Sequence, residues 1–420
     1  MDGDAIRPLK IEDFSLLDPN VQSNPRPFYA LLHEQCPVYR MPETGMYMVT
    51  RYDDVRAVLR DTERFSNDLV AAAGMNSGAG NIYQDTLKAR GWGHVQTLQR
   101  TDPPVHGRYR RLLDRVFNID QVKNLTPHIE ALAHELIDRF IDRGECEFVS
   151  EFALPLPGIV IAEQLGLNRD DIATFKKWAD SILAPAMIPM NEEELLACAE
   201  IELEMQHFLA RMFEDRRANP RRDLVSELVN ARAEGEEPLS VHELQNLMHQ
   251  LISGGYDTTI AAIANGLWLL LRYPDQMAKL RADPSLIKGF MEESLRYESP
   301  VQGLVRRTTC DVEVAGTVIP ANSVVIVRYG AANHDPGKFE CPHQFDIERS
   351  NAGAHMAFGI GTHFCVGRLL ARQEIITGFE VLLSRITDIE LARPLPRPPH
   401  HPSLLLHPMK ELPIRFKKIA

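Results

Sequence analysis

The chain has 420 residues, 44% of them hydrophobic, so it can bury a large core and form one large domain or two to three smaller ones. Its 58 acidic and 46 basic side chains give a formal net charge of −12, which argues against non-specific nucleic-acid binding. Six cysteines lie scattered without C-x-x-C spacing, a pattern typical of a reducing compartment. We therefore expect a cytoplasmic protein without a disulfide framework, a zinc finger or a nucleic-acid role.

No segment has the pattern of a membrane anchor. Residues 1–14 mix acids, bases and apolar side chains and lack the apolar core of a signal peptide. The most apolar stretch, residues 260–271, contains Asn265 and is shorter than the roughly 20 residues that span a bilayer. We expect no membrane association.

The first hundred residues predict a small β-hairpin beside helices. Residues 27–35 and 53–59 have helical patterns, and strand-like residues 38–40 and 47–50 lie between them. Residues 66–100 contain several glycines and few periodic apolar positions, which predicts a long loop broken by short helices. Such a loop is either a binding wall or a plain surface excursion, and its sequence favours neither.

Residues 102–111, DPPVHGRYRR, open a helix that we expect to run to about Phe117. His106 and Arg110 share one face of it at i,i+4 spacing. By itself, such a run of cations indicates a solvated helix face. Residues 124–217 then have a helical period with breaks at 155–157 and 184–191.

A capping box of Ser240 and Glu243 opens a very long helix that we expect to end near Arg272. Its middle, residues 254–259, reads GGYDTT. Glycine is a poor helix former that costs roughly 1 kcal/mol against alanine. We therefore expect a local widening or kink, with close packing against a neighbouring helix as the alternative.

Glu293 and Arg296 lie one helical turn apart, a spacing that on its own indicates an ordinary surface pair. After Pro300 the pattern changes to short strands. Because side chains alternate along a strand, only one of Arg306 and Arg307 should face inward. The predicted strands span residues 301–307, 312–314, 318–319 and 324–327.

Residues 358–367, FGIGTHFCVG, lead directly into a helix-like run from 368 to about 383. Gly359 and Gly361 permit backbone conformations that other residues avoid, and Gly367 lets a flat group lie close to the chain. The N–H groups and the dipole of the helix favour a deprotonated sulfur. We therefore expect Cys365 to be an anionic metal ligand, whereas a cysteine without this context is usually a small buried hydrophobe.

This loop resembles the haem-binding loop of the cytochrome P-450 monooxygenases. Six positions match within ten residues: Phe358, Gly359, Gly361, His363, Cys365 and Gly367. The resemblance implies haem b, with Cys365 as the proximal iron ligand and Phe358, Gly359, His363 and Gly367 among the cofactor-binding residues. It also implies a single domain over residues 1–420, mainly α-helical with small β-sheets and a long central helix over the haem.

The same resemblance implies roles for the earlier motifs. His106 and Arg110 match positions that contact the haem propionates, and Arg306 matches another, with Arg307 as its rival. Residues 254–259 resemble the oxygen-activation motif, in which Thr258 donates a hydrogen bond to bound dioxygen and Asp257 relays protons. These two are the implied catalytic residues.

The resemblance also implies a buried structural ion pair of Glu293 with Arg296. The family usually has arginine or histidine where this chain has Gln344. We therefore expect that the network is weaker here, or that a neighbour such as His343 completes it.

The implied reaction inserts one oxygen atom from O2 into an unactivated C–H bond. Electrons would come from NAD(P)H through a reductase and a ferredoxin, and we expect a basic surface patch for that donor. A peroxide-driven peroxygenase would need no such patch, and a haem-based sensor would have little need of Asp257 and Thr258. The residues expected in the patch are Arg108, Arg111, Arg115, Arg368 and Arg372.

Apolar residues beside these motifs suggest a terpenoid, steroid or aromatic substrate. They are Gly254, Val301, Leu304, Val305 and the leucines at 404–406. A carboxylated substrate would need a cation in the pocket, for which the long loop offers Lys88, Arg90 and Arg100. The resemblance makes the break at 184–191 a mobile lid, with ordinary core filler as the alternative. We expect the protein to be a monomer.

Overall fold

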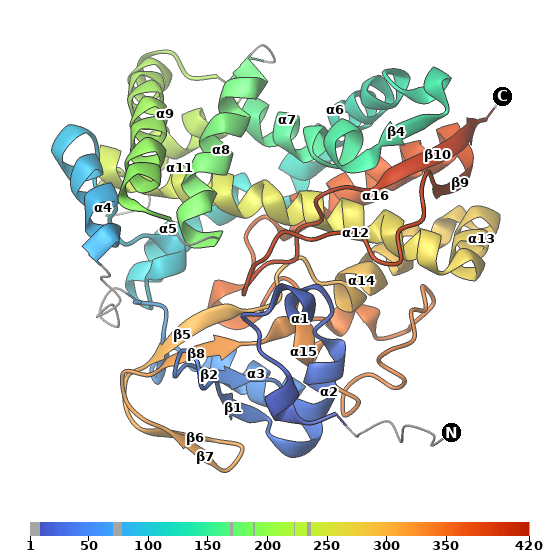
Figure 1. Cartoon of the computed structure of the whole chain (residues 1–420). Helices are drawn as coiled ribbons and strands as arrows, with labels where there is room; N and C mark the ends of the chain where they lie inside the picture. The colour runs from blue at the N-terminus through green and yellow to red at the C-terminus, as the bar shows by residue number, and fades with distance from the viewer. Residues whose placement is uncertain are drawn as a thin grey trace.

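A computed structural model describes residues 9–69, 78–168, 171–187, 190–221, 223–232 and 237–419. The protein is mainly α-helical with three small β-sheets (Figure 1), as the sequence predicted. Among the described residues, no helix is both long and apolar enough to cross a bilayer.

The largest sheet brings strands from residues 38–66 together with strands from residues 304–327. Its strand order is β1-β2-β8-β5-β3, with β1 (Val38–Arg40) antiparallel to β2 (Tyr47–Val49) as the predicted hairpin. β2 then pairs in parallel with β8 (Val324–Val327), which is antiparallel to β5 (Leu304–Thr308). β5 also pairs with β3 (Phe65–Ser66). Helices α2 (Arg26–Gln35) and α3 (Tyr52–Arg60) accompany this sheet in the lower part of Figure 1.

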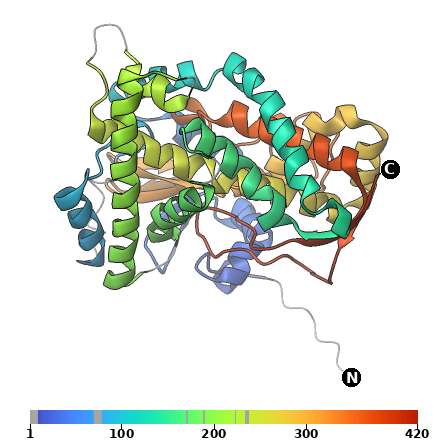
Figure 2. The ribbon, with the colours of Figure 1, turned by 90° about the horizontal axis from the view of Figure 1, so that it is seen from above.

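A helical layer covers the other side of the molecule (Figures 1 and 2). Its largest core cluster joins α6 (Ile119–Asp138), α7 (Pro155–Gln164), α11 (Val241–Gly255), α12 (Asp257–Arg272) and α16 (Arg368–Arg385), and every residue of α12 from Thr259 to Leu270 is buried. The other helices of this side are α4 (Gly78–Arg90), α5 (Val105–Val116), α8 (Ile172–Met187), α9 (Glu192–Ala218), α10 (Leu224–Asn230), α13 (Pro274–Ala282) and α14 (Ile287–Tyr297).

The expected long central helix is two helices. α11 (Val241–Gly255) opens at the predicted capping box of Ser240, and α12 (Asp257–Arg272) follows after Tyr256. Tyr256 separates them with ψ of −78°, and its ring packs edge-on against Phe175 at 5.8 Å. The Tyr256 N–H still donates to the Ile252 carbonyl, and the Tyr256 carbonyl accepts from the Ile260 N–H, so this one-residue break is the local widening or kink that the sequence predicted.

Several elements differ from the sequence prediction. Strand β4 (Glu145–Glu147) was missed, and it pairs with β10 (Pro413–Lys418), which also pairs with β9 (Ile386–Leu391). The predicted long loop contains the 13-residue helix α4, and α8 continues through Pro185 to Met187. Residues 70–77 and 188–189 lie outside the described residues, so the lid and wall interpretations are untested there.

Two of the leucines predicted to line the substrate pocket have other contacts. Leu404 and Leu405 pack, together with Val305, against the apolar cluster of Phe28, Leu32 and Met48 around α2 and β2. Leu404 and Leu405 are only partly buried, so these contacts do not test their predicted place beside the substrate. Leu406 pairs through an isolated bridge with Val301, which keeps that part of the segment beside β5.

Candidate functional site

The cysteine loop has the backbone that its glycines predicted. Gly359 and Gly361 have φ of 65° and 74°, in the left-handed region that favours glycine. A Cβ at Gly361 would lie 2.9 Å from the Leu59 carbonyl oxygen, so α3 leaves no room for a side chain there. The Cys365 N–H donates to the Phe358 carbonyl at 3.0 Å and closes the loop before α16 begins.

Cys365 lies deep in the protein, yet part of its surface is accessible, so it borders an internal space. A Cβ built on Gly367 meets no atom within 4 Å, which extends that space along the loop. Burial raises the pKa of the Cys365 thiol, although the Gly367 N–H and Arg110 act against it. The helix terminus alone therefore does not produce the thiolate that the sequence argument expected. A cation bound to the sulfur would complete its deprotonation.

Two histidines meet beside the loop. The rings of His106 on α5 and His363 have centroids 4.3 Å apart, and both side chains are shielded from solvent. His363 Nε2 is buried without a hydrogen-bond partner. Burial, together with the charge of Arg306, lowers the pKa of His363 to about 3, so the ring is neutral.

Two arginines converge on the same place. Arg110 donates to the Phe364 carbonyl and to Asp114, which ties α5 to the cysteine loop. Arg306 is buried, donates to its own strand at the Val305 carbonyl at 2.8 Å, and hydrogen-bonds the buried Tyr329. Arg307 points the other way, toward the Asp68 carbonyl and Asn322. Strand alternation thus selects Arg306 as the inward arginine.

These donors fit a haem. Two guanidinium groups and two imidazoles surround an internal space, and one of their ring nitrogens lacks a partner. Such a set is suited to buried carboxylates like the two propionates of haem b. A thiol and a glycine with open space on its Cβ side complete the set of groups that a flat iron cofactor requires.

The helix break brings another set of polar groups to the interior. Gly254 is exposed and has no atom within 4 Å of a built Cβ, although Leu251, Ile252 and Tyr256 around it are buried. Thr258 Oγ1 donates to the Gly254 carbonyl at 2.7 Å. Burial raises the pKa of Asp257 to about 6, with a further contribution from Asp180. The motif therefore combines a free hydroxyl lone pair with a carboxyl that titrates near neutral pH.

Comparisons with known proteins agree with this site. The protein-family model Cytochrome P450 matches residues 173–412. The cytochrome P450 monooxygenase PikC of Streptomyces venezuelae is 35% identical over 97% of this chain and 94% of its own. The steroid C26-monooxygenase of Mycobacterium tuberculosis strain H37Rv is 32% identical over 96% of this chain and 97% of its own.

A solved structure has the same fold. That of cytochrome P450 CYP109Q5 from Chondromyces apiculatus matches with a TM-score of 0.85, at 34% identity, over 97% of this chain and 98% of its own. This chain belongs to the cytochrome P450 family. As a P450 it is a haem b monooxygenase that uses O2 and a redox partner.

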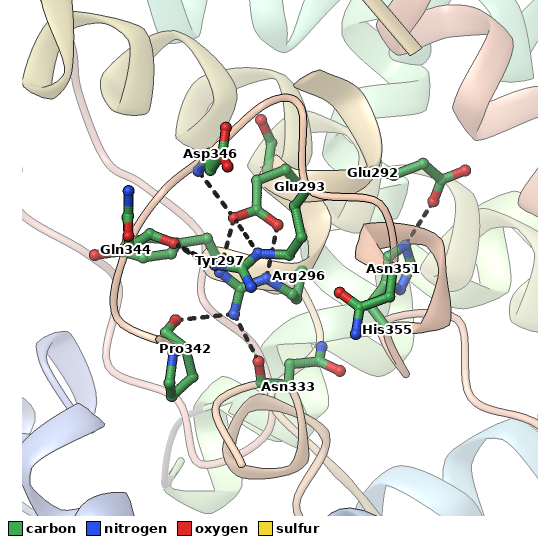
Figure 3. A network of polar contacts seen from close by, with 12 residues as sticks. Glu292, Glu293, Arg296, Tyr297, Asn333, Pro342, Gln344, Asp346, Asn351 and His355 are labelled. Atoms are coloured by element: carbon green, nitrogen blue, oxygen red, sulfur yellow. Dashed lines mark hydrogen bonds and ion pairs between the residues drawn. The ribbon is translucent and has the colours of Figure 1, made fainter. Parts of the chain in front are cut away.

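The P450's Glu293–Arg296 pair lies at the centre of a closed polar network (Figure 3). Both side chains are fully buried, and Arg296 donates to Glu293 through Nε at 2.7 Å and Nη2 at 2.8 Å. Arg296 also donates to the carbonyls of Asn333 and Pro342. The predicted buried ion pair is therefore confirmed.

The second cation of this network comes from a residue that sequence reasoning missed. Arg349 Nε lies 3.1 Å from Glu293 Oε1, and Arg349 also donates to the Gln344 carbonyl. His343 does not contact Glu293, so the expectation that it completes the network was wrong. Arg349 lies four residues after Phe345, in a loop, so the periodicity of a helix or strand could not predict its contact with Glu293. Tyr329, the partner of Arg306, was missed for the same reason.

The predicted donor patch is smaller than expected. Arg108 is an ion-pair partner of Glu243 on α11 instead of a surface residue. Arg372 is paired with Glu292, and Arg368 lies over the Phe364 ring at 4.6 Å. Two of the five expected cations are therefore neutralised by carboxylates, and Arg115 is tied to the Arg232 carbonyl.

Proposed function

We propose that this P450 hydroxylates an unactivated C–H bond of an apolar small molecule, with electrons from NAD(P)H through a reductase and a ferredoxin. The observation that carries the proposal is the helix break, where Gly254 has open space beside it and Asp257 and Thr258 are partly buried. The whole chain, residues 1–420, would form one cytoplasmic, monomeric domain.

We assign the cofactor contacts to the residues that converge inside. Cys365 would ligate the iron, and His106, Arg110, Arg306 and His363 would hold the propionates. Phe358 and Gly359 would support the loop, and Gly367 would face the ring plane. When bound, haem b supplies the redox chemistry that cleaves dioxygen with two electrons.

The protein must deliver two protons for each oxygen atom inserted, because the second oxygen atom leaves as water. Thr258 would hold a proton at Oγ1, now engaged by the Gly254 carbonyl at 2.7 Å. Asp257 would exchange protons with the side that faces α8, where Lys176 and Asp180 are close enough to shift its pKa. A pKa of about 6 lets this carboxyl both accept and release a proton near neutral pH.

We further infer an apolar substrate of the terpenoid, steroid or aromatic type. Gly254 leaves space above the break, and Leu304 and Val301 on the β5 side are only partly buried. A relative that matches nearly the full chain is named a steroid C26-monooxygenase, which supports a steroid among these candidates.

The test is turnover of a terpenoid, steroid and aromatic panel, driven either by NADPH with reductase and ferredoxin or by peroxide. Donor-supported hydroxylation that exceeds peroxide-supported hydroxylation supports the proposal. Equal or greater turnover with peroxide indicates a peroxygenase, and binding without turnover by either route indicates a sensor.

A further inference from the structure

A second polar cluster lies where α4, α9 and α11 come together at one end of the molecule (Figure 1). His94 follows α4, Glu202 belongs to α9, and His249 belongs to α11. Their ligand atoms, one ring nitrogen from each histidine and one carboxylate oxygen, all lie within 4.8 Å of one another. Nothing in the haem site or in the proposed chemistry uses these three side chains.

The distances are those of ligands around one ion. Glu202 Oε1 lies 2.9 Å from His94 Nε2 and 3.4 Å from His249 Nδ1. Tetrahedral Zn²⁺ with bonds of about 2.0 to 2.1 Å holds its ligand atoms about 3.4 Å apart. His94 Nε2 and Glu202 Oε1 are now joined by a hydrogen bond, so an ion would widen that contact by about half an ångström and bring the two ring nitrogens, which lie within 4.8 Å, to a similar spacing.

His249 gives an independent indication of a ligand. Its Nδ1 is buried and makes no hydrogen bond, even though a carboxylate oxygen lies 3.4 Å away. Buried polar atoms without a partner are uncommon and costly. His249 Nδ1 and Glu202 Oε1 are therefore close to each other without a hydrogen bond between them, as two ligands of one metal ion would be.

Surrounding side chains hold the cluster in position. The Tyr83 hydroxyl donates to the other Glu202 oxygen, and Gln206 Nε2 donates to Oε1 at 3.1 Å. The Gln84 amide contacts His94 Nδ1 at 3.0 Å. In the structure the amide nitrogen faces Nδ1, and a 180° rotation of the amide would turn its oxygen toward Nδ1–H and free the His94 Nε2 lone pair for an ion. Such outer partners orient the ligands of most protein metal sites.

The charge also suits a cation. Glu202 is 1% exposed, and a buried carboxylate is costly without a compensating positive charge. Arg100 lies near enough to interact with it, but no hydrogen bond joins the two among the described residues. Two imidazoles and one carboxylate favour Zn²⁺ and similar transition-metal ions over Mg²⁺ or Ca²⁺.

We propose that His94, Glu202 and His249 form a Zn²⁺ site, with solvent in the fourth position, that fastens residues 91–97 to α9 and α11. Side chains of both helices already hold this segment, since the Trp92 N–H donates to Gln206 and the Val95 N–H donates to Asn246. The segment leads into α5, which carries His106 and Arg110. The ion would therefore stiffen the chain just before the predicted propionate contacts.

The test is Zn²⁺ titration of the tag-free, haem-loaded protein by calorimetry after chelator treatment, with zinc per haem counted by plasma mass spectrometry. We expect one Zn²⁺ per chain. His249→Ala removes a ligand whose Nδ1 has no hydrogen bond to lose, and should weaken binding by about 100-fold or more. Gln84→Ala should weaken it by about 10- to 100-fold.

His242→Ala is the matched control, because His242 is exposed on the same helix two turns earlier. It should bind Zn²⁺ like the unchanged protein. Absence of a stoichiometric site in the unchanged protein would overturn the proposal. Equal affinities of His249→Ala and His242→Ala, with haem spectra intact in both, would overturn it as well.

Discussion

Two polar regions of this P450, the network around Glu293 and the break between α11 and α12, differ in how many hydrogen bonds their carboxylates accept. Around Glu293 every charge is paired: its Oε1 accepts from Arg296, from Arg349 and from the Asp346 N–H (Figure 3). At the helix break, no hydrogen bond to the Asp257 carboxylate is found among the described residues. Gly254 is exposed, with no atom within 4 Å of a Cβ built on it.

The difference teaches where polar groups stabilise the fold and where they remain available for chemistry. A buried charge with all its hydrogen bonds satisfied resists movement and proton exchange. A buried carboxyl without partners has a shifted pKa and can still take up or release a proton. Substitutions on the two sides should therefore affect different properties, stability on one side and coupling of oxygen use to product on the other.

The largest effect is expected at the closed network. Glu293→Gln leaves two guanidinium groups facing a neutral amide, so it should lower the free energy of unfolding by about 3 to 5 kcal/mol. Denaturant unfolding of the haem-loaded protein measures this. Glu292→Gln is the adjacent control: Glu292 pairs with Arg372 and His355 but is partly exposed, so its loss should cost less, about 1 to 2 kcal/mol. Equal losses in the free energy of unfolding for the two variants would show that the network around Glu293 does not stabilise the fold more than the Glu292 contacts do.

An intermediate effect is expected at Glu374 on α16, a buried carboxyl with no hydrogen-bond partner among the described residues. Burial raises its pKa from 4.5 to about 8. Between these values the folded protein holds a proton that the unfolded chain has released, so stability falls as pH rises through this window. Glu374→Gln removes this loss of stability. The fall in the free energy of unfolding between pH 5 and pH 7 should therefore be smaller by roughly 2 kcal/mol in this variant.

Thermal unfolding across this pH range measures the Glu374 effect. Glu380→Gln removes an exposed carboxyl on the same helix whose pKa burial and Glu130 also raise, so it should flatten the slope by less than Glu374→Gln does. An unchanged slope in Glu374→Gln would mean that Glu374 is ionised in the folded protein.

The open region should respond in coupling instead of stability. Thr258→Ala removes the hydroxyl proton carrier but keeps the helix break, so product per O2 consumed should fall by about tenfold or more while peroxide rises. Thr258→Ser keeps the hydroxyl and should restore most coupling. Product and peroxide are counted per NADPH with the redox partners present. Normal coupling in Thr258→Ala would remove its catalytic assignment.

The smallest effect is expected at Gln344. The family usually has a cation there, but Arg349 already supplies the second positive charge to Glu293. Gln344→Arg should therefore change the free energy of unfolding by less than about 0.5 kcal/mol. Stabilisation well above that value would show that Arg349 does not replace the missing cation.

Local patterns predicted much of this molecule. The capping box of Ser240, the left-handed glycines at 359 and 361, the hairpin of β1 and β2, and the Arg306 and Arg307 alternation depend on neighbours in sequence. The cysteine motif was identified because six of its ten positions match the family's haem-binding loop. Each of these features follows from residues within one turn or one strand.

The features that were missed depend on distant partners. β4 has only three residues, and it forms because β10 at the far end of the chain offers an edge. Arg108 was expected at the surface, but the capping-box residue Glu243 lies opposite it. Arg349 reaches Glu293 from a loop whose path is set by packing. Sequence periodicity does not predict such long-range contacts, so only the structure could reveal them.

The most direct test of the haem site is the absorption spectrum of the reduced protein under carbon monoxide, measured for the unchanged chain, Cys365→Ala and Cys310→Ala. Cys310 is exposed and serves as the matched control. We predict a strongly red-shifted Soret band for the unchanged protein and for Cys310→Ala, and its loss in Cys365→Ala. The same red-shifted band in Cys365→Ala, or no haem in the unchanged protein after expression with ample haem, would contradict the assignment of Cys365 as the iron ligand.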